Sequence, residues 1–179
     1  MTRLISFITT FLVVCAVGCA TAPKSGGEQQ ALINDANATL ASMTTRDPGL
    51  HDLLARSAGY VVFPGIGKAA WGVGGAWGRG VLYENGQPHG FVQLTQASFG
   101  FQGGAQKLAE LIVFSSNDAL NNLKGGKFEL GGNLSAVVVT TGAAAAARFA
   151  NGVAVFQLPK GGLMVEASVA GQRLDYSGA

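Results

Sequence analysis

Glycine-rich stretches with the letters of phosphate-binding motifs are the first places where this chain could do chemistry. Gly65 to Ala70 reads G-x-G-x-x-A after an apparent strand, as in loops that hold the pyrophosphate of a dinucleotide. Such a loop must open a helix, because N–H groups at the helix start bind the phosphates, and the glycines after Trp71 disfavour a helix. Two Gly-Lys pairs fail as phosphate loops, since Ala69 and Phe128 stand where Ser or Thr is required. We interpret the first stretch as a glycine-rich turn between strands.

Residue types suited to acid–base, nucleophilic or metal chemistry are sparse. The two histidines, His51 and His89, are too far apart for a metal-binding pair at helical spacing. Ser98 follows Gln-Ala and so lacks the first glycine of a nucleophile elbow. The acidic residues are too scattered for any pair to be assigned as a glycosidase dyad. We therefore expect that the protein is not an enzyme and that it holds no metal or other cofactor.

Composition favours a globular protein and excludes several classes. The 179 residues include 27 glycines, are 48% hydrophobic and 12% charged, and have a formal net charge of +2 at pH 7. A disordered chain would need low hydrophobicity and high charge, and a collagen would need glycine at every third position. The weak charge, without a basic block, argues against nucleic acid as a partner. The length fits one domain.

The first 18 residues predict a bacterial lipoprotein signal peptide. Arg3 supplies a positive start, Leu4 to Val14 form an apolar core too short to span a membrane, and Ala16 to Cys19 form a small-residue cleavage site. Cleavage before Cys19 would leave one cysteine, which carries the acyl chains, so no internal disulfide is expected. An ordinary secretory peptide is the alternative.

The expected organisation follows from this signal. Residues 1–18 are the signal peptide, residues 19–27 are the acylated cysteine and a flexible tether, and residues 28–179 are a single domain. The acylated Cys19 predicts a lipid anchor in the bacterial cell envelope. In a bacterium with two membranes, the neutral Ala20 after the cysteine predicts the periplasmic face of the outer membrane.

The first third of the domain has helical periodicity, with apolar residues at intervals of four, four and three on one stripe. These residues are Leu32, Ala36, Leu40 and Met43. They predict a helix over about 30–43, and Asp47 followed by Pro48 predicts the start of a second helix over 48–57. Two uses of the stripe stay open: packing on the rest of the domain, or contact with a membrane.

From Gly59 onward the pattern is of short strands and tight turns. Asn85-Gly86, after the strand at 81–83, predicts a hairpin whose return strand is 90–94. A second hairpin is predicted to join 153–158 to 163–169. Further strands are predicted at 98–103, 107–114, 127–132 and 134–142, with a short helix at 117–124. The alanine-rich run 137–147 fits a buried strand, although its alanine half fits a helix equally well.

Many short strands with tight turns predict an antiparallel sheet that curls or closes. The expected fold is therefore α+β. Two short N-terminal helices pack on a curled, mostly antiparallel, glycine-rich sheet or barrel-like sheet, with one short internal helix.

Three ordered motifs then resemble one family. They are Ala58-Gly-Tyr-Val-Val-Phe-Pro64, Gly74-Gly-Ala-Trp-Gly-Arg-Gly80 and Gly100-Phe-Gln-Gly-Gly-Ala-Gln106. Their order and spacing are similar to those of the SYLF domain family, and the resemblance covers about residues 30–175. Bacterial members are commonly predicted lipoproteins, and this chain resembles that branch.

The resemblance implies a lipid-binding module. Eukaryotic members bind phosphoinositides and act with actin regulators. Gly131-Gly-Asn133 and His89-Gly-Phe91 depart from the pattern of many members, so the actin connection is not carried over. The resemblance leaves an expected affinity for membrane phospholipids with anionic headgroups. The alternative is a structural or protein-interaction module of the envelope, with an unknown protein partner and no lipid contact beyond its anchor.

Basic and aromatic residues near the second motif are the expected headgroup contacts. Lys68 and Arg79 would attract phosphate, and the indoles of Trp71 and Trp77 suit a headgroup interface. The apolar stripe would add insertion through Leu32, Leu40 and Met43. The alternative for each is an isolated cation on a solvated face, or a tryptophan or apolar side chain in the core.

Overall fold

The computed structural model describes residues 23, 25–71, 73–99, 104–126, 128–132, 134–160, 169 and 171–178. Cys19 and the expected signal peptide therefore lie outside the described residues. Within the described residues, the chain order of the elements is α1 Gly26–Arg46, α2 Gly49–Ala55, β1 Gly59–Trp71, β2 Val73–Glu84, β3 Gln87–Phe99, β4 Gly104–Phe114, α3 Asn117–Lys124, β5 Phe128–Glu129, β6 Ala136–Val138, β7 Val153–Lys160 and β8 Gln172–Gly178.

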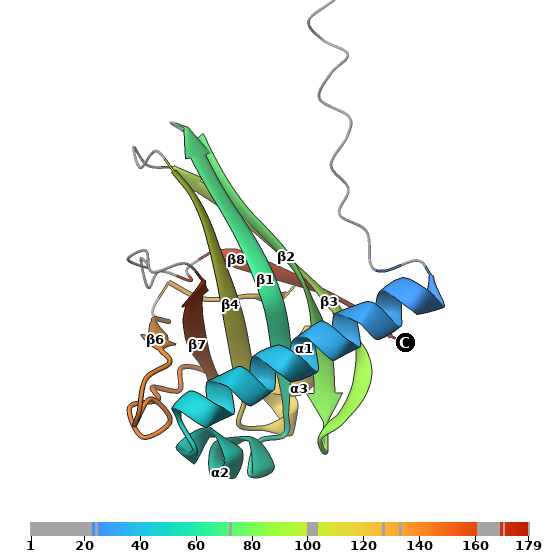
Figure 1. Cartoon of the computed structure of the whole chain (residues 1–179), viewed down its shortest axis with the longest axis vertical. Helices are drawn as coiled ribbons and strands as arrows, with labels where there is room; N and C mark the ends of the chain where they lie inside the picture. Colours follow the sequence, from blue (N-terminus) through green and yellow to red (C-terminus); the bar gives the residue numbers. More distant parts are fainter. Residues whose placement is uncertain are drawn as a thin grey trace, which may run out of the picture.

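The described strands form one eight-stranded sheet in the order β5-β8-β3-β2-β1-β4-β7-β6. Every pair is antiparallel except β6 with β7, which is parallel. The sheet curls so that β8 passes behind the long central strands, while α1 lies diagonally across the opposite face (Figure 1). This arrangement confirms the predicted α+β fold.

The two N-terminal helices form where the periodicity places them, with longer bounds for the first. The hydroxyl of Ser25 accepts the N–H of Glu28 and caps α1, so the helix begins inside the segment expected to be a tether. Asp47 ends α1, and its carboxylate also accepts the N–H of Gly49 at the start of α2. The helix therefore begins at Gly26, two residues before the expected start of the domain.

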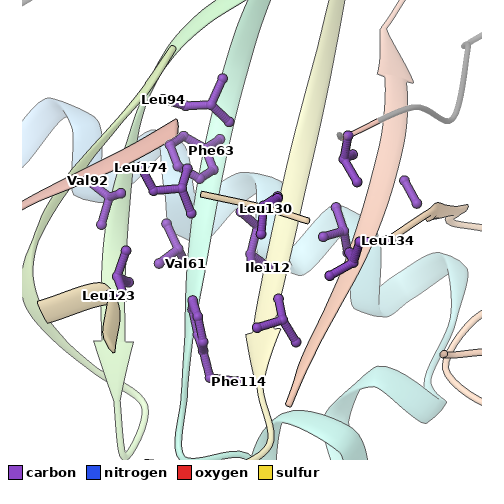
Figure 2. Close-up of a cluster of buried hydrophobic side chains, with 14 of the residues drawn as sticks. Val61, Phe63, Val92, Leu94, Ile112, Phe114, Leu123, Leu130, Leu134 and Leu174 are labelled. Carbon is purple, nitrogen blue, oxygen red and sulfur yellow. The ribbon is translucent and has the colours of Figure 1, made fainter. Parts of the chain in front are cut away.

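The side chains of each strand alternate between two apolar clusters, one on each face of the sheet. The inner cluster lies inside the curl and the outer cluster lies under α1. On β1, Val61 and Phe63 belong to the inner cluster, and Tyr60 and Val62 to the outer one. Figure 2 shows the inner cluster, where labelled side chains from β1 and β4 meet residues of β3, β8 and α3.

Gly65 to Ala70, interpreted from the sequence as a turn between strands, instead lies within β1. A bulge at the start of this stretch changes the alternation. From Val62 to Gly65 the strand advances three residues, while its neighbour β2 advances two, from Val81 to Arg79. The register shifts at the same point against β4. In a regular strand, residues three positions apart face opposite sides of the sheet. Because of the extra residue in the bulge, Phe63 and Ile66 both belong to the inner cluster.

A buried polar group interrupts the inner face. Glu110 of β4 is fully buried, and the side-chain amides of Gln157 and Gln172 donate to its Oε2 at 2.7 and 3.3 Å. Gln157 lies directly opposite Glu110 on β7, whereas Gln172 reaches it from β8. These hydrogen bonds join β8 to β4 and β7 across the curl.

Two glycines of β2 make room for the inner cluster. A Cβ atom on Gly78 would lie 2.9 Å from Cγ1 of Ile66, and one on Gly80 would lie 2.7 Å from Cδ1 of Phe63. Because the interior is closely packed, the missing side chains are part of how Phe63 and Ile66 fit. The abundance of glycine in the strands therefore has a packing cause at these two positions.

Gly80→Ala is expected to destabilise the fold. Overpacking against Phe63 and the carbonyl oxygen of Val62 should lower the free energy of unfolding by roughly 1–3 kcal/mol. Urea unfolding followed by circular dichroism measures it. Gly65→Ala is the matched control, because a Cβ there meets no atom within 4 Å. Equal stability of the two variants would contradict this packing role.

Two predicted strands are much shorter in the structure. Of 134–142, only Ala136–Val138 is strand, and residues 141–146 form turns. The cause is tertiary: Oδ1 of Asp47 accepts the N–H of Gly142 and Oδ2 accepts that of Ala144, and Gly142 has a φ of 85°. The alanine half of the run is therefore neither buried strand nor helix. Of the described residues in 127–132, only Phe128–Glu129 is strand, and Leu130 extends the backbone hydrogen bonding to Gly171 and Gln172.

The hairpin at Asn85-Gly86 is confirmed, with φ values of 51° and 75° at the two turn residues and strands β2 and β3 on either side. The predicted helix at 117–124 and the strand at 107–114 are also confirmed. The return strand of the second hairpin lies outside the described residues apart from Val169, and β7 pairs with β4 and β6. Most of the predicted strand at 98–103 is also outside them; its residues 98–99 end β3.

Candidate functional site

The outer face of the sheet carries both the covering helix and the exposed residues of interest. α1 buries Ala36 and Met43 against the outer cluster, which includes Tyr60, Val62 and Tyr83. Figure 1 shows that β1, β2 and β4 continue well beyond the helix. The outer face is therefore divided into a covered part and an uncovered part, with a border along α1.

A tyrosine pair fixes α1 to the sheet. The hydroxyl of Tyr83 donates to Oδ1 of Asn37 at 2.7 Å, and the ring of Tyr83 stacks on that of Tyr60 with centroids 5.2 Å apart. The pKa of Tyr83 is raised from 10.0 to about 12, mainly by burial and further by the electrostatic influence of Tyr60. Burial also raises the pKa of Tyr60. The neutral phenols are thus part of the packed helix–sheet contact.

Alkaline pH is expected to weaken this contact. A phenol with a folded-state pKa near 12 and an unfolded value of 10.0 contributes stability that is fully present below pH 10 and is lost as the pH rises through about 12. The free energy of unfolding should fall over that interval, and it should fall less in Tyr83→Phe. An equal loss in both proteins would contradict the assignment to Tyr83.

A row of residues crosses the uncovered part of the outer face. The strand register places Trp77 of β2 opposite Gly67 of β1, Gly67 opposite Lys107 of β4, and Lys107 opposite Lys160 of β7. Directly opposite residues on neighbouring strands share a face. Arg79 follows Trp77 by two positions on β2, so it also shares this face. We call Arg79, Lys107 and Lys160 the basic patch.

Trp77 lies beside the basic patch with 51% of its surface exposed. A Cβ atom on Gly67 would lie 3.1 Å from Cε2 and Cζ2 of Trp77, so the absent side chain leaves space for the indole on the sheet. An exposed indole beside cations is the arrangement expected at a membrane interface, because the ring is apolar and carries one N–H donor.

The basic patch is electrostatically unbalanced. Lys107 and Lys160 are exposed and directly opposite each other, and like charges in such a pair destabilise a sheet. The ion pairs seen in the described part of the chain are Glu84 with His89 and Lys124, and Arg173 with Asp175, and none involves the basic patch. An anion bound between the two lysines would relieve their repulsion.

A pocket of about 420 Å³ opens where the basic patch meets α1. The helix contributes Leu32, Asp35 and Ala38, and the bulge of β1 contributes Pro64 and Gly65. Two cations of the patch complete the lining, Arg79 from β2 and Lys160 from β7. The pocket thus combines apolar atoms, two positive charges and one negative charge.

Of the four basic and aromatic contacts expected from the sequence, the structure describes the side chains of two. Arg79 and Trp77 lie on one face of β2 and are exposed. Lys68 and Trp71 lie in β1, where the structure describes the strand but not these two side chains.

The apolar stripe of α1 packs on the domain. Met43 has 0% exposure, so it is unavailable as a membrane anchor in this structure, and Leu32 and Leu40 are half-buried against the outer cluster. The stripe therefore takes the first of its two predicted uses. The physical reason is that the outer face of the sheet offers an apolar surface that water would otherwise contact.

Three residues of the site are not among the headgroup contacts expected from the sequence: Lys160, Lys107 and Asp35. Lys107 and Lys160 are 53 positions apart in the chain, and only the pairing of β4 with β7 places them side by side. In the sequence, Asp35 is one of several polar residues of the predicted helix and has no distinguishing motif. Alternation of apolar and polar residues could have placed Lys107 and Lys160 each on a strand face, but it does not reveal that β4 and β7 pair.

Among the described residues, no helix combines the length and apolar character needed to cross a membrane. Within the same residues, no group of three or more His, Cys, Asp or Glu side chains is placed to hold a metal ion. The chemistry of the described site is that of cations, one carboxylate and apolar surface.

A protein-family model matches part of the chain. Residues 95–177 match the family model described as "Ysc84: Las17-binding protein actin regulator". The match runs from the second half of β3 to β8 and includes Lys107 and Lys160, whereas Arg79 and α1 precede it. A comparison with curated proteins gives no match. The resemblance predicted from the sequence is confirmed over residues 95–177, where the chain matches the Ysc84 (SYLF) family model.

Proposed function

We propose that this protein is an envelope lipoprotein, acylated at Cys19, whose SYLF-type domain binds membrane phospholipids through their anionic groups and has no enzymatic activity. The observation that carries the proposal is the basic patch of Arg79, Lys107 and Lys160, which has no ionic partner among the described residues. Trp77 supplies an interfacial ring next to it. The site of action is then the envelope membrane, with the outer membrane expected in a two-membrane bacterium.

The uneven charge distribution supports this function despite a net charge of only +2. A basic residue close to an anionic bilayer contributes about 1 kcal/mol to binding. Three such residues on one face, together with Trp77, attract an anionic bilayer locally, even though the net charge of the whole chain is small. Because the face is largely strand, the cations are held in a fixed pattern.

Vesicle co-sedimentation tests the proposal with the chain from Pro23 onward, since every described helix and strand lies after that residue. Binding to phosphatidylcholine vesicles should rise with added phosphatidylglycerol and fall with salt. Lys107→Gln and Lys160→Gln should each weaken binding to anionic vesicles about fivefold, the equivalent of about 1 kcal/mol. Arg148→Gln is the matched control, because Arg148 is exposed in the loop before β7, outside the patch.

Equal binding of the patch variants and the control would show that the basic patch is not the membrane face. Absence of binding to every composition would overturn the proposal. The acyl chains on Cys19 would then be the expected lipid contact, and the partner of the domain would have to be sought among envelope proteins.

Trp77 provides an independent readout. The chain has two tryptophans, so Trp71→Phe leaves Trp77 as the single indole. On addition of anionic vesicles its fluorescence emission should move to shorter wavelength, because the half-exposed ring leaves water for the headgroup region. Vesicle binding without an emission change would place the membrane face away from β2.

A further inference from the structure

We propose that the pocket between α1 and the β1 bulge selects a phosphoethanolamine headgroup, with the phosphate held by Arg79 and Lys160 and the ammonium held by Asp35. This inference rests on the proposed phospholipid binding and names the headgroup class at the same site. It goes beyond a general attraction to anionic surfaces, because it assigns a role to the one carboxylate of the pocket.

The charge pattern of the pocket is the first argument. Arg79 and Lys160 suit a phosphate, and the guanidinium offers it a two-pronged donor. A headgroup that is only anionic would leave the carboxylate of Asp35 repelled by the ligand. A zwitterionic headgroup satisfies all three side chains, since its cation and anion are joined by a short linker.

The placement of Asp35 is the second argument. Its neighbour Ala36 is buried against the sheet, and Asn37 accepts the hydroxyl of Tyr83 at 2.7 Å. These contacts fix both the position and the rotation of the helix. Leu32, Asp35 and Ala38 then recur at intervals of three, which places them along one edge of α1 facing the pocket. The tertiary structure therefore holds Asp35 at the border of the pocket.

The span of the site is the third argument. Arg79 and Lys160 come from strands separated by β1 and β4, or three strand spacings of about 4.8 Å each. Both residues line the pocket, which lies between their two strands. Its volume of about 420 Å³ lies within the usual range for ligand pockets of roughly 300–1,000 Å³. Leu32, Ala38 and Pro64 offer apolar contact for the glycerol end of a lipid.

The chemistry of the ammonium separates two common zwitterionic headgroups. A primary ammonium, as in ethanolamine, has three N–H donors for a carboxylate. The quaternary ammonium of choline has none. The pocket should therefore prefer phosphatidylethanolamine to phosphatidylcholine, although the two lipids give vesicles of equal net charge.

The test compares three vesicle types with the chain from Pro23 onward: pure phosphatidylcholine, an equal mixture with phosphatidylethanolamine, and an equal mixture with phosphatidylglycerol. The unsubstituted chain should bind the ethanolamine mixture roughly fivefold more tightly than pure phosphatidylcholine, the factor that one net hydrogen bond gives. Asp35→Asn should abolish that preference and bind the glycerol mixture more tightly, because a negative charge is removed. Asp52→Asn, an exposed acidic residue of α2 outside the pocket, should change neither preference.

Opposite effects of Asp35→Asn on the two mixtures would support the assignment, since a loss of folding would weaken both. Equal binding of ethanolamine and choline vesicles by the unsubstituted chain, with binding to the glycerol mixture retained, would overturn this inference and leave the proposed function standing. Failure to bind any vesicle would overturn both. Soluble glycerophosphoethanolamine separates the sources: if it binds the pocket while ethanolamine vesicles do not, the lipid assignment is wrong.

Discussion

One extra residue in β1 organises both faces of the sheet. The bulge between Val62 and Ile66 changes the parity of this strand against β2 and β4 together. Without it, Ile66 would leave the inner cluster and Gly67 would turn inward, because a shift of one residue sends every later side chain to the other face. With it, Gly67 lies between Trp77 and Lys107 on the outer face, and the bulge itself lines the pocket.

The candidate site depends on this bulge and on a second constraint, the packing of α1 on the outer face of the sheet. The helix covers an apolar part of the outer face and meets the basic patch at the pocket. Burial of Ala36 and Met43 supplies the attraction, while the hydrogen bond from Tyr83 to Asn37 specifies the rotation. The pocket thus results from two independent features, the bulge within the sheet and the packing of α1 on the sheet. Neither feature requires a bound ligand.

The basic patch has a different physical character from the rest of the molecule. Both core clusters are apolar and closely packed, and the buried carboxylate of Glu110 accepts hydrogen bonds from two amides. By contrast, Lys107 and Lys160 repel each other across neighbouring strands. Proteins tolerate such local imbalance at binding sites, where a ligand supplies the missing charge. This contrast is why the patch, rather than the interior, carries the proposed function.

The sequence by itself determined the local elements and the class of fold. The apolar stripe predicted α1, Asn85-Gly86 predicted the hairpin between β2 and β3, and alternation predicted β4, because these signals depend on residues close together in the chain. Three ordered motifs resembled the SYLF family, and the family model matches residues 95–177, which contain the third of these motifs.

Only the tertiary structure decided which residues form the site. Sequence reasoning chose Arg79 and Trp77, but no motif tied Lys107, Lys160 or Asp35 to them. It also overextended the strand near residue 140, where Asp47 holds the backbone of Gly142 and Ala144 in a turn. Strand pairing, the bulge and helix docking join residues far apart in the chain. Their energies come from contacts that no local pattern encodes, so side chains that are separate in sequence became one site only on folding.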